Sequence, residues 1–285
     1  MFLVKVCATS ANVCVGFDVL GLALNLTNDF TFEKSDKFEF TGFDDCYSNC
    51  KNNLVYYAYE RAFKYAKKEI IPVKIGIDCK IPVSRGLGSS SSLIVAGVYG
   101  ANLMMGNILS TKQIFNLCTL IEGHPDNVAP AIFGGLVASY KNGKYYKSIN
   151  YPVSKKLKFT VIIPPYKLST HEAREALPKE LGYEAIVNNL SRIVNIPYAF
   201  KKGNVRLLKE LFNDSLHEPY RGALIKDYKA IKEELKNEKV AFAISGSGST
   251  MIAISYDTSF IDKLNKYDVV IKTLEVGSKV EIKEV

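Results

Sequence analysis

Apolar and polar residues alternate along several short stretches of the chain and follow helical spacing along others. Alternation at 29–43 predicts two strands joined by a polar turn, and the pattern at 134–149 predicts a hairpin around Asn142-Gly143. Further strands are expected at 2–6, 73–81, 157–164, 239–245 and 250–255. Helices are expected at 52–68, 89–105, 110–123, 183–213 and 223–237, and the last thirty residues predict a helix and a final strand.

The order of these elements indicates an α+β fold, because strands come first, then helices, then both kinds mixed. The polar stretch "NYPVSKK" at 150–156 is the expected boundary between an N-terminal domain at 1–152 and a C-terminal domain at 153–285. With 285 residues, 47% of them hydrophobic, the chain can form one large domain or two modest ones with buried cores.

The sequence shows none of the segments that direct a chain to a membrane or out of the cell. No apolar run approaches the roughly 18 residues of a membrane span, and the start "MFLVKVCATSAN" lacks the pattern of a signal peptide. The six cysteines form no CxxC pair, so neither a zinc site nor a redox motif is indicated and reduced thiols are expected. We therefore expect a cytoplasmic protein with no membrane partner.

The charge of the chain says little about its partner until the arginines are considered separately. The formal charge is +8, but lysines are interleaved with glutamates, as on solvated helix faces. We expect no nucleic-acid partner, and the positive excess equally suits an anionic small molecule. Only six of the 37 basic residues are arginines, so each is a candidate for bidentate recognition of a carboxylate or phosphate.

The stretch "IPVSRGLGSSSS" at 81–92, which we call the serine loop, lies between a predicted strand and a predicted helix. Gly86 and Gly88 allow the backbone to bend and approach a ligand, and the serines begin a helix whose first N–H groups have no internal partner. Such a helix start binds anions. The loop lacks the lysine of a P-loop, and a flexible Gly/Ser linker is the alternative interpretation.

A second polar cluster lies in "EGHPDNVAPAIFGG" at 122–135, where Glu122, His124, Asp126 and Asn127 fall within six positions. The alternative to a functional site is a capped turn, with Asp126 as the N-cap of the next helix. Glu122 together with a serine hydroxyl and phosphate oxygens would suit Mg²⁺, which takes few protein ligands.

Three further stretches carry candidate binding groups. "STHEAREALP" at 169–178 and "HEPYRG" at 217–222 each contain an arginine near His, Glu and Pro. Arg174 and Arg221 together could clamp a carboxylate, and ordinary salt bridges are the alternative. "SGSGS" at 245–249 is a second glycine-rich turn, for which a tight hairpin is the simpler explanation.

Taken in order along the chain, these motifs resemble those of the GHMP kinases. "TSANVCVGFD" at 9–18, the serine loop and "SGSGS" are similar to the three motifs of that family. "EGHPDNVAPAIFGG", "EPYRG" and the Thr170–Pro178 stretch resemble the branch that phosphorylates L-homoserine. The resemblance implies a ribosomal protein S5 domain 2-like N-terminal domain and a ferredoxin-like C-terminal domain. It also implies ATP and Mg²⁺ as cofactors, a small-molecule substrate, O-phospho-L-homoserine as the product in threonine biosynthesis, and a homodimer.

The resemblance assigns roles to individual residues. The expected ATP-binding loop consists of Pro82, Val83, Ser84, Arg85, Gly86, Leu87, Gly88, Ser89, Ser90, Ser91 and Ser92, and Mg²⁺ would be held by Ser90 and Glu122. The expected substrate residues are Asn12, Asp18, His124, Thr170, Arg174 and Arg221. In that set Asp18 is expected near the substrate ammonium and the arginines on its carboxylate. The expected catalytic residues are Asp126, Asn127 and Arg174, and the base stays unassigned.

Two motifs depart from the family pattern. Cys14 and Val15 stand where the family has Gly and Pro, beside the expected substrate site, and "SGSGS" ends in Ser where the family has Pro. The shape of the loop at 12–18 is therefore not given by the resemblance, although Asn12 and Asp18 are retained. Arg85 is left with two interpretations, a solvent-facing charge or a nucleotide contact.

Two other functions remain open at this point. One is a GHMP kinase for another carboxylate-bearing alcohol, of the shikimate or mevalonate type, and the other is a non-catalytic nucleotide-binding sensor. Asp18 favours a substrate that carries an ammonium group. Glu122 and the full serine loop favour an enzyme over a sensor.

Overall fold

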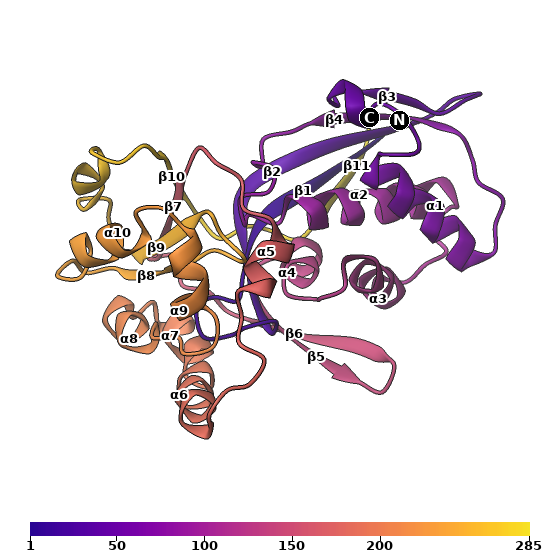
Figure 1. Cartoon of the computed structure of the whole chain (residues 1–285). Coiled ribbons are helices and arrows are strands. Elements are labelled where there is room, and N and C mark those ends of the chain that lie inside the picture. Colours follow the sequence, from indigo (N-terminus) through magenta and orange to yellow (C-terminus); the bar gives the residue numbers. More distant parts are fainter.

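The computed structural model describes all 285 residues and contains two β-sheets, each with its own set of helices (Figure 1). The first sheet has seven strands, in the order β11-β1-β2-β4-β3, with β5 paired to β2 and β6 paired to β5. Its strands are β1 (Phe2–Ala11), β2 (Leu20–Lys34), β3 (Glu39–Thr41), β4 (Val73–Asp78), β5 (Leu136–Asn142), β6 (Tyr145–Tyr151) and β11 (Glu281–Glu284). Its helices are α1 (Leu54–Ala66), α2 (Ser89–Met104), α3 (Thr111–Glu122) and α4 (Val128–Phe133), with one 3-10 turn at Asp45–Tyr47.

The second sheet has four antiparallel strands in the order β10-β7-β9-β8. These are β7 (Lys158–Ile163), β8 (Ala241–Ile244), β9 (Met251–Ser255) and β10 (Val270–Leu274). Its helices are α5 (Thr170–Glu175), α6 (Tyr183–Ile193), α7 (Ile196–Lys202), α8 (Val205–Leu211), α9 (Glu218–Arg221) and α10 (Tyr228–Glu234), and 3-10 turns lie at Gly222–Leu224 and Ile261–Leu264. The predicted α+β class with two sheets is confirmed.

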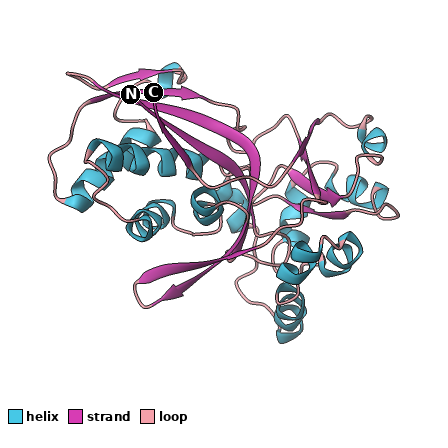
Figure 2. Cartoon of the chain, turned by 180° about the vertical axis from the view of Figure 1, so that it is seen from behind, coloured by secondary structure: helices cyan, strands magenta, loops and turns pink.

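The last strand crosses back to the first sheet. β11 pairs antiparallel with β1, so the two ends of the chain lie side by side in both views (Figures 1 and 2). Residues at the end of the predicted second domain thus complete the first sheet, and the boundary at 152 stays a prediction.

Three predictions of secondary structure were wrong in detail. The predicted helix at 183–213 is three helices, because Pro197 lies in the first turn of α7 and the left-handed Gly203 ends α7 before Asn204 caps α8. The predicted helix at 223–237 begins only at Tyr228, after a 3-10 turn. The last thirty residues contain two strands and a short 3-10 turn rather than a helix and one strand.

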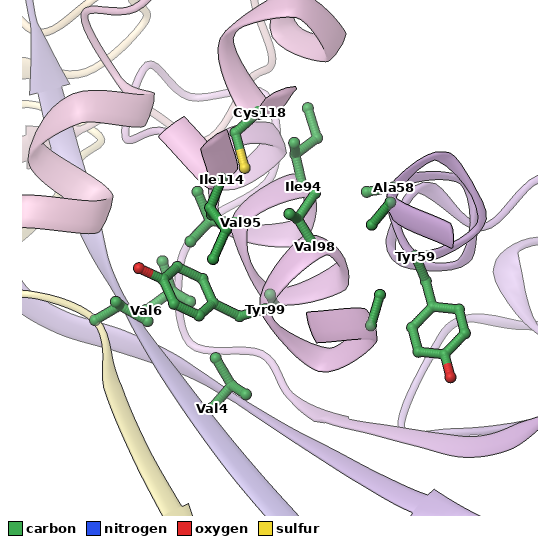
Figure 3. Packing of buried hydrophobic residues seen from close by; sticks show 14 of the residues in the cluster. Val4, Val6, Ala58, Tyr59, Ile94, Val95, Val98, Tyr99, Ile114 and Cys118 are labelled. Atoms are coloured by element: carbon green, nitrogen blue, oxygen red, sulfur yellow. The ribbon is translucent and has the colours of Figure 1, made fainter. Parts of the chain in front are cut away.

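The core of the first domain is built around α2. Fourteen of its sixteen residues are buried, because the first sheet lies on one side and α1 and α3 on the other. Figure 3 shows Ile94, Val95, Val98 and Tyr99 of α2 between the β1 side chains and Ala58 and Tyr59 of α1. A helix packed on all sides holds its first turn in place, and that turn begins at the serine loop.

A second core cluster of 25 buried residues joins the two domains. It includes Val13, Cys14 and Leu87 from the first half of the chain and Phe159 and Phe200 from the second. The loops at 12–18 and 81–92 therefore lie where the domains meet, and both are anchored by buried side chains.

Candidate active site

A cavity of ≈ 400 Å³ opens between the two domains and brings the predicted motifs together. Its size is typical of small-molecule sites, which span about 300–1,000 Å³. The predicted residues that line it are Asn12, Asp18, Val83, Ser84, Arg85, Gly86, Gly88, Ser89, Ser90, Glu122, His124, Asp126, Asn127, Thr170, Arg174 and Arg221. Four predicted loop residues do not line the cavity: Pro82, Leu87, Ser91 and Ser92.

The serine loop connects β4 to α2 within one domain, so the flexible-linker interpretation is wrong. Gly86 and Gly88 both have positive φ, at 75° and 68°. A side chain on Gly88 would collide with the Thr9 hydroxyl, and one on Gly86 would collide with the carbonyl oxygen of Ser245. The glycines therefore let this loop pack directly against β1 and the "SGSGS" turn, with the start of α2 facing the cavity.

The serines of the loop have different tasks. Ser90 Oγ and Ser91 Oγ both donate to Glu122 Oε1, at 2.6 and 2.8 Å. Ser92 Oγ donates to the carbonyl of Ser89 and accepts from Asn28, so it stabilises the first turn of α2. One carboxylate and one or two hydroxyls that converge at a helix start are oxygen donors of the kind that Mg²⁺ takes. These residues fit Mg²⁺ held jointly with phosphate oxygens.

Arg85 ties the serine loop to the second domain. Its Nε donates to the carbonyl of Pro164 at 3.0 Å, and its Nη2 donates to that of Pro165 at 2.7 Å. Arg85 is therefore not a free surface charge, because carbonyls that follow β7 hold its guanidinium, although one side of this group is exposed to solvent. Arg85 also borders the cavity, so a nucleotide contact through its exposed side stays a prediction.

His124, Asp126 and Asn127 lie between the serine loop and the charged end of the cavity. His124 Nδ1 lies 2.7 Å from Asp126 Oδ1, and Thr9 donates to Asn127 Oδ1 at 2.7 Å. Burial lowers the pKa of His124, but the hydrogen bond and charge of Asp126 outweigh it and leave this pKa raised. The N-cap of α4 is Asn127 and has no side-chain cap bond, so the interpretation of Asp126 as a helix cap is wrong.

The charged end of the cavity holds an ion pair between Asp18 and Arg174. Two guanidinium nitrogens donate to the two carboxylate oxygens, each at 3.0 Å. The hydrogen bond to Asp18 raises the pKa of Arg174. In this structure the salt-bridge interpretation thus holds for Arg174, and its partner is the carboxylate expected to meet the substrate ammonium.

Arg221 supports the same end from behind. It is 2% exposed and donates to the carbonyls of Ala173 and Gly246, at 3.0 and 3.2 Å. Burial, and next the positive charge of Arg174, lower the pKa of Arg221. Both guanidinium groups lie over the ring of Phe17, at 5.6 Å for Arg174 and 5.1 Å for Arg221.

The loop that carries Asp18 is held by side chains to which the sequence analysis assigned no role. Asn12, Val13, Cys14 and Asp18 all have positive φ, which is unfavourable for residues with a side chain. His217 Nε2 donates to the carbonyl of Cys14 at 2.7 Å, and Asn189 donates to that of Val15 at 3.2 Å. Phe17 stacks on the His217 ring, with centroids 5.4 Å apart.

Asp214 completes this support. It accepts from Asn189 and from the N–H groups of Leu216, His217 and Glu218. Phe17, Asn189 and Asp214 were missed as site residues. Only Phe17 had a sequence signal, since it stands next to Asp18 inside the first motif.

The far end of the cavity was also missed. It is lined by residues around the 3-10 turn, the start of α1 and the end of β4: Phe43, Asp44, Tyr47, Asn52, Asn53, Leu54, Val55, Ile77 and Cys79. These residues form no recognisable pattern in the sequence, because three separate elements contribute them. The cavity thus has a far end lined by both apolar and polar side chains, a helix start in the middle and a charged end.

This fold and site define the class of the protein. The family model described as "GHMP kinases N terminal domain" matches residues 53–135, and "GHMP kinases C terminal" matches 198–268. A crystal structure of mevalonate kinase shares the fold, with a TM-score of 0.73 at 16% identity over 97% of this chain and 99% of that one. The two domains and their cavity are those of a GHMP kinase.

The comparisons also specify the branch. The chain is similar to homoserine kinase of Clostridium beijerinckii, with 41% identity over 94% of this chain and 91% of that protein. Homoserine kinase of Clostridium acetobutylicum is 39% identical over 94% and 92%. The crystal structure of homoserine kinase from Cytophaga hutchinsonii has a TM-score of 0.87 at 26% identity, covering 99% of this chain and 97% of that one. The chain belongs to the homoserine kinase family.

Proposed function

We propose that this protein transfers the γ-phosphoryl group of ATP to the side-chain hydroxyl of L-homoserine, giving O-phospho-L-homoserine and ADP. The observation that carries the proposal is the Asp18–Arg174 pair at the charged end of the cavity. An α-amino acid has its ammonium and carboxylate on one carbon, so both groups reach two neighbouring side chains of opposite charge. When a zwitterionic amino acid binds there, the Asp18–Arg174 ion pair is replaced by two: its ammonium pairs with Asp18 and its carboxylate pairs with Arg174.

The same pair argues against the other GHMP substrates. Mevalonate and shikimate have a carboxylate but no ammonium, so they would occupy Arg174 and leave Asp18 without a partner. An uncompensated carboxylate next to a bound carboxylate is unfavourable. Arg221 adds positive charge from behind the site and has no acidic hydrogen-bond partner of its own.

The rest of the cavity suits ATP. In this proposal the triphosphate lies along residues 82–92 at the start of α2, and the adenine ring of ATP lies toward the far end around Tyr47 and Asn53. Ser90 and Glu122 would hold Mg²⁺, which neutralises phosphate charge when bound. Asp126 and Asn127 line the cavity between the serine loop and the Asp18–Arg174 pair, and they would orient the reacting hydroxyl.

The chemistry needs positioning and charge more than a strong base. Phosphoryl transfer proceeds through a loose transition state, so catalysis depends on alignment of the hydroxyl and stabilisation of charge on the phosphoryl oxygens. Thr170 and His124 border the charged end and would help to orient the amino acid. The proposal assigns no side chain as the base.

The cellular setting completes the proposal. None of the helices combines the length and apolar character needed to cross a bilayer. All six cysteines are unpaired, which suits a reducing compartment, and we propose a cytoplasmic enzyme that acts in threonine biosynthesis as a homodimer.

A substrate panel tests the function. The protein is incubated with Mg-ATP and, separately, homoserine, mevalonate, shikimate and galactose, and ADP release is measured. ADP release with homoserine is expected, with the other three near the background without substrate. If ADP is released with only one of the other three compounds, that compound is the substrate in place of homoserine. If ATP raises the melting temperature but no compound gives ADP release, the protein is a nucleotide-binding sensor.

A further inference from the structure

Two guanidinium groups lie close together at the charged end of the cavity, and only one of them has a carboxylate partner. Arg174 binds both carboxylate oxygens of Asp18, whereas the buried Arg221 donates to backbone carbonyls alone. Burial, and next the positive charge of Arg174, lower the pKa of Arg221. Burying a cation beside a like charge is unfavourable, so we expect a further group of negative potential near Arg221.

The ring of Phe17 is such a group for both arginines. The Cζ atom of Arg221 lies 5.1 Å from the ring centroid and that of Arg174 lies 5.6 Å from it, both over the ring. The face of an aromatic ring is negative and attracts a cation within about 6 Å of its centre. The other cation–ring contacts of the protein are all lysines over tyrosines, so Phe17 carries both arginine contacts.

The ring of Phe17 is itself held in place by the second domain. It stacks on the imidazole of His217, with centroids 5.4 Å apart and 28° between the planes. His217 is fully buried and is hydrogen-bonded to the carbonyl of Cys14. Phe17 is half-buried and does not line the cavity, so it acts on a bound ligand through the two arginines and not by direct contact.

The Phe17 ring gains importance when a substrate carboxylate binds. The Arg174 guanidinium has two contacts in this structure, the Asp18 carboxylate and the Phe17 ring. In the proposed function the substrate ammonium takes over Asp18, so the ring is the protein contact that Arg174 keeps. Because the same ring contacts Arg221, it keeps the two guanidinium groups together while both face one carboxylate.

We propose that Phe17 is a positioning residue, whose ring holds the guanidinium groups of Arg174 and Arg221 together for the substrate carboxylate. This role rests on the proposed function, since that function brings a carboxylate to the arginines. It makes Phe17 a determinant of affinity for the carboxylate-bearing substrate. Affinity for ATP, which is proposed to bind at the serine loop, does not depend on it.

Stepwise fluorination of the ring tests this role. 4-Fluoro-, 3,5-difluoro- and 3,4,5-trifluorophenylalanine at position 17 lower the negative potential of the ring with little change in its size. KM is measured for whichever compound of the substrate panel releases ADP. It should rise with each fluorine, to about tenfold for the trifluoro ring, while kcat and KM for ATP stay near their wild-type values.

The same series at Phe133 is the matched control, because that ring is also half-buried but packs against Phe115, away from the cavity. It should leave every kinetic constant near its wild-type value. If KM is the same for all the rings at position 17, Phe17 supports the loop by packing alone and the proposal is wrong. A rise in KM for ATP that equals the rise for the other substrate would also overturn it.

A second measurement needs no turnover. Protons over an aromatic ring are shifted upfield by its ring current, so the Nε–H proton signal of Arg174 should move downfield in Phe17→Leu. The signal is identified by its loss in Arg174→Lys. A signal that stays in place in Phe17→Leu would contradict the contact. If no compound of the panel releases ADP, the proposed function fails, and the nuclear magnetic resonance spectrum still decides whether Phe17 holds the arginine.

Discussion

The serine loop and the loop at 12–18 line the same cavity but are built in opposite ways. The serine loop offers backbone groups at the start of a buried helix; its two glycines adopt positive φ without strain, and Ser84 is its one residue with a side chain that also has positive φ. The loop at 12–18 offers charged and polar side chains, and four of its residues with side chains adopt positive φ. For Val13 and Cys14 this costs about 1–2 kcal/mol each in isolation, and less for Asn12 and Asp18, whose residue types adopt this region more readily.

The difference follows from what each end is proposed to bind. Phosphate is recognised by any group of N–H donors, so a locally folded helix start is sufficient. An amino acid is recognised by one negative and one positive group at fixed separation, so Asp18 and Arg174 must be aimed. The second domain supplies the necessary support, through hydrogen bonds from His217 and Asn189 to the carbonyls of Cys14 and Val15.

The largest effect is expected at the nucleotide end, from Glu122→Gln. The change keeps a partner for the Ser90 and Ser91 hydroxyls but removes the negative charge proposed to hold Mg²⁺. We expect kcat to fall about 10³-fold, as when one charge-stabilising group is removed from a transition state. Steady-state ADP release at saturating substrates measures this, and Glu180→Gln, the same change at an exposed residue that does not line the cavity, is the matched control. A Glu122→Gln enzyme with wild-type kcat at low Mg²⁺ would remove Glu122 from the metal site.

At the substrate end, Arg174→Lys is expected to have the next largest effect. Lysine keeps the positive charge but cannot form the two parallel bonds that Arg174 makes, and a hydrogen bond to a charged group is worth about 1.5–3 kcal/mol. KM for homoserine should rise about 10- to 100-fold while KM for ATP stays near its wild-type value. Equal changes in both KM values would mean that Arg174 supports the whole cavity rather than the amino-acid end.

A smaller effect is expected from His217→Leu, which tests whether the second domain aims the loop. Leucine fills much of the buried space but leaves the Cys14 carbonyl without its donor, at a cost of about 1–3 kcal/mol. The urea midpoint should fall, and KM for homoserine should rise several-fold more than KM for ATP. His217→Gln keeps an N–H donor at a similar reach and should recover most of the KM. Failure of that recovery would show that only the packing of the ring on Phe17 matters.

The difference between the two loops also explains which site residues could be predicted from the sequence. The serine loop, Glu122 and the two arginines were found because each belongs to a short motif with a local signal. The partners of the loop at 12–18 lie 174 and 203 residues away from the carbonyls they hold, so no local pattern predicts them. Distance along the chain also hid the pairing of β11 with β1.

Burial and composition explain the remaining differences in the fold. The first half of β2 was not predicted, because Leu20–Leu24 is buried at every residue and shows no alternation. The breaks inside 183–213 did have a local signal in Pro197 and Gly203, which the apolar spacing of the surrounding residues outweighed. The exposed apolar residues of α6 at Tyr183, Ile186, Val187 and Leu190 have that same spacing, so the pattern alone did not separate them from residues that pack on a core.

The smallest effect is expected at the His124–Asp126 pair, which lies between the serine loop and the charged end of the cavity, and it concerns stability. The pKa of His124 is raised in the folded protein, so the pair stabilises the fold fully below the ordinary pKa of about 6.5 and loses this contribution as pH rises through the raised value. The free energy of unfolding of the wild type should therefore exceed that of His124→Gln by more near pH 6 than near pH 9. Urea unfolding without ligands at the two pH values measures the difference. If the difference in free energy of unfolding instead grows with pH, His124 is bound to Asp126 mainly as a neutral ring. The His124–Asp126 pair would then be held by an ordinary hydrogen bond, like the contacts of the serine loop, rather than by charge, like the Asp18–Arg174 pair.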